Sequence, residues 1–270
     1  MRPAFFLLAH SMKRVRSLIL TMSFLLAGFQ ILLTLVAKSI ERANAFEEMS
    51  RVVPDFLRQL MGPSFVALMS FRGIVCVGYF HIAVMGSLIG LMIALATEPA
   101  AEIESGFTDL VLSRPLARHW VITRTLVLLL CCTGFSVFLM MLGTWAGLYW
   151  LAPKGVEWPA PGLIRSLALN LGVLMLCWGG VTAAVSAACR RRSVAGSTAG
   201  LLTLAAYLLD YLARVWEPAQ KVAWLSPFRY YSPLDRILGV KIPGHHLWVL
   251  VSVAVAGFAL AYVVFARRDL

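Results

Sequence analysis

The stretch TEPAAEIESGFTDLVLSRPLARHWVITR, residues 97–124, is the longest polar interruption in the middle of a very apolar chain. It contains four of the thirteen acidic residues and three of the arginines. Long apolar runs lie on both sides of it, separated by other polar segments. The chain therefore divides into predicted membrane spans and the segments that connect them.

The composition is typical of a membrane protein. Of the 270 residues, 60% are hydrophobic and 14% are charged, whereas soluble domains average about 45–50% and about 25%. Apolar runs of this length predict membrane spans, which must be helices because lipid leaves the backbone of open strands unsatisfied. Six runs qualify, at residues 17–37, 73–97, 126–151, 166–188, 193–213 and 247–266. We therefore expect one all-α transmembrane domain over residues 1–270.

The net charge of +11 does not indicate nucleic-acid binding, because the basic residues flank the predicted spans, as the positive-inside rule expects. With six spans and both termini inside, the two sides hold equal numbers of Lys and Arg, but the inside segments are shorter and more densely basic. The clearest single signal is the arginine cluster at 190–192. We expect a multi-pass protein, surrounded by lipid, with both termini in the cytoplasm.

Two segments near the N-terminus have the composition of surface helices. Residues 3–16 predict a short interfacial helix, with an apolar patch followed by basic residues. Residues 45–61 have apolar residues at helical spacing and predict an amphipathic helix at the outer surface. Pro54 should kink or divide that helix.

The long outer segment at 215–245 is rich in aromatic residues and proline. Pro227 and Pro233 exclude one continuous helix, so short helices at the interface are expected. Just before this segment, Asp210 and Arg214 lie four positions apart at the end of the fifth span, a spacing that predicts a local ion pair.

The central stretch predicts two short helices. Pro99 suits a first helical turn, and the acids that follow favour the N-terminal half of a helix. Ser105 and Gly106 should end this helix, and residues 107–115 should form a second one that Pro115 stops. A minimal connection between helices needs only about 2–8 residues, so this segment is more than a simple loop.

Small residues four apart allow helices to approach closely. Three such pairs occur in the predicted spans, at Gly86/Gly90, Gly143/Gly147 and Gly196/Gly200. His81 also lies within a predicted span. An intramembrane histidine is either functional or a partner in a hydrogen bond between helices.

The sequence contains no recognisable catalytic, nucleotide-binding or metal-binding motif. Without any Gly-Lys dipeptide, it lacks the loop that cradles nucleotide phosphates in many ATPases. The five cysteines lie in or beside spans without Cys-x-x-Cys spacing, so we expect packing residues rather than a disulfide framework or a zinc site. His245 and His246 are the weak metal candidate; we expect no metal and no cofactor in this chain.

The central stretch resembles the signature segment of bacterial type-2 permeases of ATP-binding-cassette exporters. It carries Glu-x-Glu-x-Gly at 102–106 and then Leu-x-Leu-Ser-x-Pro-x-x-Arg at 110–118. The family pattern has Thr at the position of Phe107, and Arg124 takes the place of a later basic residue. The six spans, the N-terminal interfacial helix and the outer Ser-Pro segment extend the resemblance over the whole chain.

The resemblance implies a half-transporter of the bacterial inner membrane that is not itself an enzyme. It would pair with a second permease copy, expected to be identical, and with two separate ATPase subunits that bind ATP and Mg. The segment between spans two and three would be the coupling helix that docks on the ATPase. The residues given this role are Glu98, Glu102, Glu104, Gly106, Leu112, Ser113, Pro115 and Arg118. The outer helices would gate the exit, around Pro227, Tyr230, Tyr231 and Pro233.

Two other functions stay open. A membrane-embedded lipid-modifying enzyme would need a polar cluster at one membrane face, and only His245 and His246 with Asp235 come close. A non-transporting subunit, through which an ATPase does mechanical work on a partner, would need the same coupling helix. Lipids, hydrophobic peptides, drugs and polysaccharides are all compatible with the apolar spans as substrates, and a heterodimer is also open.

Overall fold

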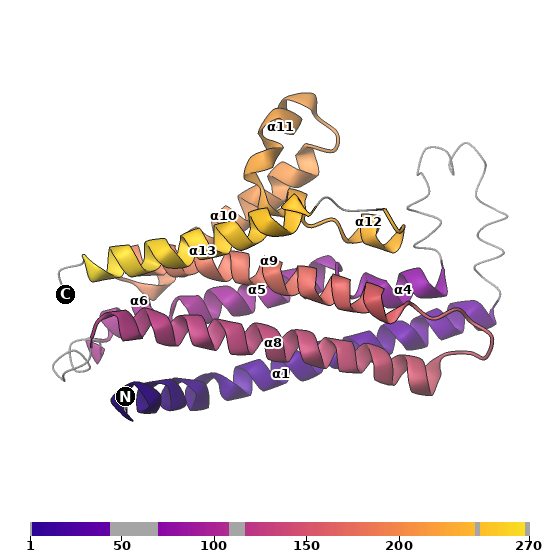
Figure 1. The fold of residues 1–270 in the computed structure, drawn as a ribbon, viewed down its shortest axis with the longest axis horizontal. Coiled ribbons are helices and arrows are strands. Elements are labelled where there is room, and N and C mark those ends of the chain that lie inside the picture. The colour runs from indigo at the N-terminus through magenta and orange to yellow at the C-terminus, as the bar shows by residue number, and fades with distance from the viewer. Residues whose placement is uncertain (1, 44–69, 108–116, 241–243, 268–270) are drawn as a thin grey trace.

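The computed structural model describes residues 2–43, 70–107, 117–240 and 244–267, and all regular elements in these ranges are helices. Six helical stretches are long and apolar enough to cross a membrane (Figure 1). The predicted all-α, multi-pass architecture is therefore confirmed at this level. The spanning helices are α1 (Arg2–Arg42), α4 (Phe71–Val77) with α5 (Ile82–Ala96), α8 (His119–Leu151), α9 (Pro161–Ala188), α10 (Arg192–Leu212) and α13 (His245–Ala266).

The first span differs from its prediction, because α1 is one continuous helix of 41 residues. The separate interfacial helix expected at 3–16 is absent as an independent element. No proline or glycine interrupts residues 4–27, so nothing in the sequence ends the helix there. At about 1.5 Å per residue, α1 is about twice as long as the hydrocarbon core is thick.

The second span is broken, whereas a continuous helix was predicted over 73–97. The chain leaves α4 at Gly78 and re-enters a helix after His81. The fully buried Gln30 of α1 packs against Gly78, where an added Cβ would lie 2.5 Å from the amide nitrogen of Gln30. His81 caps α5, since its Nδ1 accepts a hydrogen bond from the backbone N–H of Ala83 at 3.3 Å. His81 therefore has a structural role at the break.

Helix α9 forms the centre of the bundle and packs against α13, α5, α8 and α10, while α1 packs along α8. Glycines permit the two closest approaches. An added Cβ at Gly143 would lie 2.5 Å from the carbonyl oxygen of Ala27 in α1, and one at Gly180 would lie 2.5 Å from the carbonyl oxygen of Ala254 in α13. Of the three predicted glycine pairs, Gly143/Gly147 thus forms a helix contact, whereas a Cβ added at any glycine of the pairs Gly86/Gly90 and Gly196/Gly200 would have no described neighbour within 4 Å.

The predicted outer segment forms short helices over its described residues 215–240, as expected. They are α11 (Glu217–Val222), the 3-10 helices η1 (Ala223–Leu225) and η2 (Pro227–Tyr230), and α12 (Pro233–Ile237). The predicted pair at the end of α10 is also present, with Arg214 Nη2 2.9 Å from Asp210 Oδ2.

The first part of α1, the last part of α13 and the short helix α6 (Glu98–Glu104) lie at the same end of the bundle (Figure 1). The turn between α9 and α10 reaches this end too, because the backbone N–H of Arg192 donates to Glu104. Two predicted helices, at 45–61 and 107–115, fall outside the described residues except for Phe107.

Candidate functional site

Helix α6 begins and ends where the sequence predicts. Pro99 occupies its first turn, and Glu98 stands in the same turn, where a carboxylate is favoured. The helix ends at Ser105, and Gly106 follows with φ of 71°, a left-handed conformation that glycine adopts without strain. Thr97 alone separates α6 from α5, so α6 continues directly from the second span.

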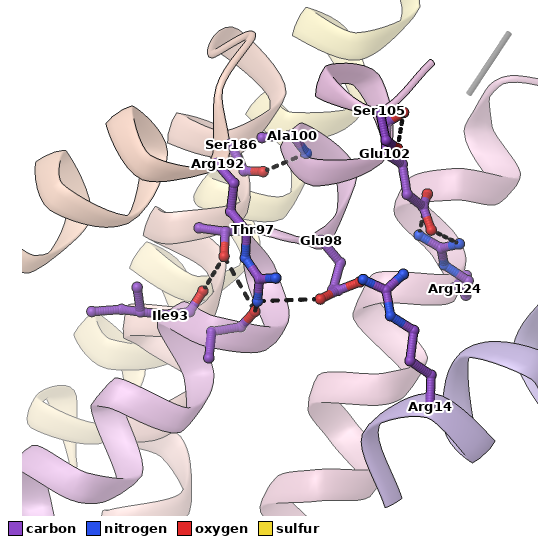
Figure 2. A network of polar contacts seen from close by, with 11 residues as sticks. Arg14, Ile93, Thr97, Glu98, Ala100, Glu102, Ser105, Arg124, Ser186 and Arg192 are labelled. Carbon is purple, nitrogen blue, oxygen red and sulfur yellow. Dashed lines mark hydrogen bonds and ion pairs between the residues drawn. The ribbon is translucent and has the colours of Figure 1, made fainter. Parts of the chain in front are cut away.

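Glu102 points into the protein and forms a two-pronged ion pair with Arg124 of α8 (Figure 2). The nitrogens Nη1 and Nη2 of Arg124 lie 2.7 and 2.8 Å from Oε1 and Oε2 of Glu102. Both residues are buried, with Glu102 only 6% exposed. Paired hydrogen bonds between an arginine and a carboxylate are the strong, directional form of this contact. The pair therefore fixes α6 to α8.

Glu98 connects α6 with two further spans. Its Oε2 lies 3.3 Å from Arg14 of α1, and its Oε1 lies 3.3 Å from Arg192 of α10 (Figure 2). Glu98 is 7% exposed, while both arginines lie near the surface. Nη2 of Arg192 also donates to the carbonyl oxygen of Ala94 at 3.2 Å. One carboxylate thus holds the first and fifth spans beside α6.

Two contacts to backbone groups complete the attachment. Glu104 Oε2 accepts a hydrogen bond of 2.9 Å from the backbone N–H of Arg192, at the N-terminus of α10. A carboxylate is favoured there because the first N–H groups of a helix have no partner within the helix. In α6, the backbone N–H of Ala100 donates to the hydroxyl of Ser186 in α9 at 3.3 Å. Helix α6 is therefore bound to α1, α8, α9 and α10.

The structure divides the predicted coupling residues into two groups. Glu98, Glu102 and Glu104 are joined to the spans, while Arg118 is exposed just before α8. Leu112, Ser113 and Pro115 lie outside the described residues. Just beyond the C-terminal end of α6, Ser105 and Phe107 are exposed, and Phe107 is 37% exposed.

Sequence reasoning missed the partners of the acids, namely Arg14, Ser186 and Arg192. The two arginines belong to the basic clusters that were interpreted only as orientation signals. These basic clusters, together with the three acidic residues in the segment between the second and third spans, are the sequence signal from which the ion pairs could have been predicted. Arg124, in contrast, is recognisable from the sequence, because it takes the place of the later basic residue of the family pattern.

The predicted outer gate residues lie where the outer segment meets the broken span. The hydroxyl of Tyr231 donates to the carbonyl oxygen of Tyr79, within the break between α4 and α5, at 2.6 Å. Burial raises the pKa of Tyr231 above the ordinary value of a phenol, so this donor stays protonated. Tyr230 donates to the carbonyl oxygen of Trp224 at 3.1 Å, and Pro227 and Pro233 begin η2 and α12.

The described residues offer ion pairs and packing rather than a metal centre. Within the described ranges, no three His, Cys, Asp or Glu side chains are close enough together to hold a metal ion. None of the five cysteines, all of which lie in the described ranges, forms a disulfide bond. The rings of His245 and His246 contact each other edge to face, and His246 lies 3.4 Å from the hydroxyl of Ser232.

Comparison of the chain with models of known protein families finds no match, and comparison with curated proteins finds none either.

Proposed function

We propose that this chain is the membrane-spanning permease subunit of an ATP-driven exporter. In this proposal it works as a dimer with a second, identical copy, and two separate ATPase subunits bind ATP and Mg. The end of the bundle that carries α6 faces the cytoplasm of a bacterium, and the spans cross the inner membrane. The chain itself has no enzymatic activity.

The observation that carries this proposal is the attachment of α6 to four helices. One buried ion pair, two ion pairs with arginines near the surface, and hydrogen bonds join a seven-residue helix to α1, α8, α9 and α10. Because α6 follows α5 after a single residue, a displacement of α6 acts on the second span as well. Rigid-body motion of packed helices is one way in which binding at one place changes a distant one. An attached helix of this kind is suited to pass such motion into the bundle.

Some residues of the coupling segment attach α6 to the spans, and others are exposed to a partner protein. Glu98 and Glu102 hold α6 to the spans and are too buried to meet a partner protein. Phe107, just beyond the C-terminal end of α6, is an exposed aromatic residue. Aromatic side chains are frequent anchors in protein interfaces. We therefore expect Phe107 to contact the ATPase.

Co-purification tests this function. The chain is co-expressed with an ATP-binding-cassette ATPase from the same genome, extracted in detergent, and tested for a stable complex with ATPase activity. Phe107→Glu should abolish the complex and leave the melting temperature of the permease unchanged. Arg267→Glu places the same acid at an exposed position after α13 and should keep the complex. Failure of the wild type to bind the ATPase, or an intact complex with Phe107→Glu, would argue against the proposal.

A further inference from the structure

A cavity of about 510 Å³ lies between the outer segment and three of the spans. Its lining comes from the start of α5, the end of α10, η2, the entry into α12, and the start of α13. Small-molecule sites measure about 300–1,000 Å³, so the cavity has the size of a ligand site. It is separate from α6, which lies toward the other end of the bundle (Figure 1).

The lining combines an aromatic floor with a charged rim. Phe228 and Tyr231 are buried in the floor, and the ring of Tyr207 meets Phe228 edge to face at 5.5 Å. On the rim, Arg229 and Asp235 are both exposed, and neither side chain has a hydrogen bond or an ion pair with another described residue. The other two charged residues in the lining, Asp210 and Arg214, neutralise each other. Among the described residues, the rim thus offers one cation and one anion that have no ion-pair partner.

The cavity lies at the level of the membrane boundary. Helix α13 has 22 residues, about 33 Å at 1.5 Å per residue, which matches a hydrocarbon core of about 30 Å. His246, its second residue, lines the cavity. Trp216, Trp224 and Trp248 are exposed nearby in the sequence, and tryptophan is enriched where lipid headgroups begin.

We propose that this cavity binds the polar head of an amphiphile that carries both a phosphate and an amine, of the phosphoethanolamine type. The guanidinium of Arg229 is a strong hydrogen-bonding partner for the phosphate. The carboxylate of Asp235 binds the ammonium group of the ligand, and the aromatic rings of the floor add a cation–π contact with it. A ligand with phosphate alone would leave Asp235 without a counter-ion. The site does not depend on an ATPase, so it stands or falls separately from the exporter function.

Native mass spectrometry of the purified, delipidated protein tests this site. Phosphatidylethanolamine and phosphatidylglycerol are added in separate titrations, since the second lipid has the phosphate but no amine. We expect the protein to retain phosphatidylethanolamine more strongly. Arg229→Gln and Asp235→Asn should each weaken its binding about tenfold, as the loss of one charged hydrogen bond predicts. Asp235→Asn should also remove the preference between the two lipids.

The neighbouring helix α11 provides matched controls, since Lys221→Gln and Glu217→Gln remove the same charges outside the cavity. Both controls should bind lipid as the wild type does, and the melting temperature of each variant checks its folding. A parallel titration with water-soluble glycerophosphoethanolamine separates the two sources of this headgroup. If glycerophosphoethanolamine binds as tightly as phosphatidylethanolamine, the ligand of the cavity is a soluble molecule. If it binds more weakly, the ligand is a membrane lipid. Equal retention of both lipids by the wild type, or equal behaviour of cavity and control variants, would overturn the proposal.

Discussion

The two terminal nitrogens of Arg124 each donate to one carboxylate oxygen of Glu102, at 2.7 and 2.8 Å, although the two residues are 22 positions apart. The pair is buried and joins α6 to α8. Leaving one charge of a buried pair without its partner costs about 3–5 kcal/mol. This contact should therefore dominate the attachment of α6.

Glu102→Gln should lower the free energy of unfolding by about 3 kcal/mol or more, because the guanidinium of Arg124 loses its counter-ion in a buried place. Glu104→Gln is the matched control, since Glu104 is exposed and a glutamine still accepts the hydrogen bond from Arg192. We expect the control to change stability by about 1 kcal/mol at most. Thermal unfolding in detergent, followed by circular dichroism, measures both.

A double-mutant cycle separates this ion pair from general damage to the fold. If the pair is the cause, Glu102→Gln combined with Arg124→Gln should cost less than the two single changes added together. Strictly additive effects would show that the two side chains stabilise the protein independently.

Gly180→Ala should destabilise the bundle, because the new methyl group would lie 2.5 Å from the carbonyl oxygen of Ala254. Overpacking of this kind costs about 1–3 kcal/mol. A methyl group added at Gly86 would have no described neighbour within 4 Å. Gly86→Ala should therefore not lower the stability of the protein. Melting temperatures of the two purified variants give the comparison. A lower melting temperature for Gly86→Ala than for Gly180→Ala would contradict this packing.

Tyr231→Phe should destabilise the protein at neutral pH by about 1–3 kcal/mol, since it leaves the buried carbonyl oxygen of Tyr79 without its donor. Burial raises the pKa of Tyr231 from its ordinary value of 10.0. Its contribution to stability is therefore complete below pH 10 and is lost as the pH rises toward the higher pKa of the folded state.

Melting temperatures between pH 8 and pH 12 check this dependence. The wild type should lose more stability above pH 10 than Tyr231→Phe does. Tyr230→Phe is the control, because Tyr230 is only half-buried and donates to a neighbour six residues away. It should follow the wild-type curve. Parallel curves for the wild type and Tyr231→Phe would rule out a contribution from the Tyr231 phenol.

Fusion proteins test the proposed orientation. Green fluorescent protein attached after Leu270 should fluoresce, because it folds in the cytoplasm of bacteria. Alkaline phosphatase inserted after Gly155, in the turn between α8 and α9, should be active, since that enzyme needs the oxidising outer side. The reverse pattern would place α6 outside and remove the basis for ATPase docking.

The helices that depend on local signals were predictable from the sequence. Pro99 and Gly106 mark the two ends of α6 by backbone preferences that need no tertiary contact. The prolines of the outer segment likewise begin η2 and α12. The pair of Asp210 and Arg214 followed from helical spacing alone.

Features that depend on distant partners were not predictable in this way. The break in the second span contains no proline, and its surroundings include Gln30 of α1 and Tyr231 of the outer segment. Likewise, the sequence alone did not indicate that Glu98 and Glu102, in the predicted coupling segment, bind arginines on other helices. Their counter-ions lie on other helices, and only folding brings them together.

The hydrogen bond from Tyr231 to Tyr79 makes two distant parts of the chain depend on each other. A carbonyl group in an interrupted span needs a donor, because lipid offers none. The outer segment supplies that donor across 152 positions. A chimera that exchanges residues 215–240 for the corresponding segment of another membrane protein would have to bring along a matching second span. The two segments can therefore be exchanged only as a pair.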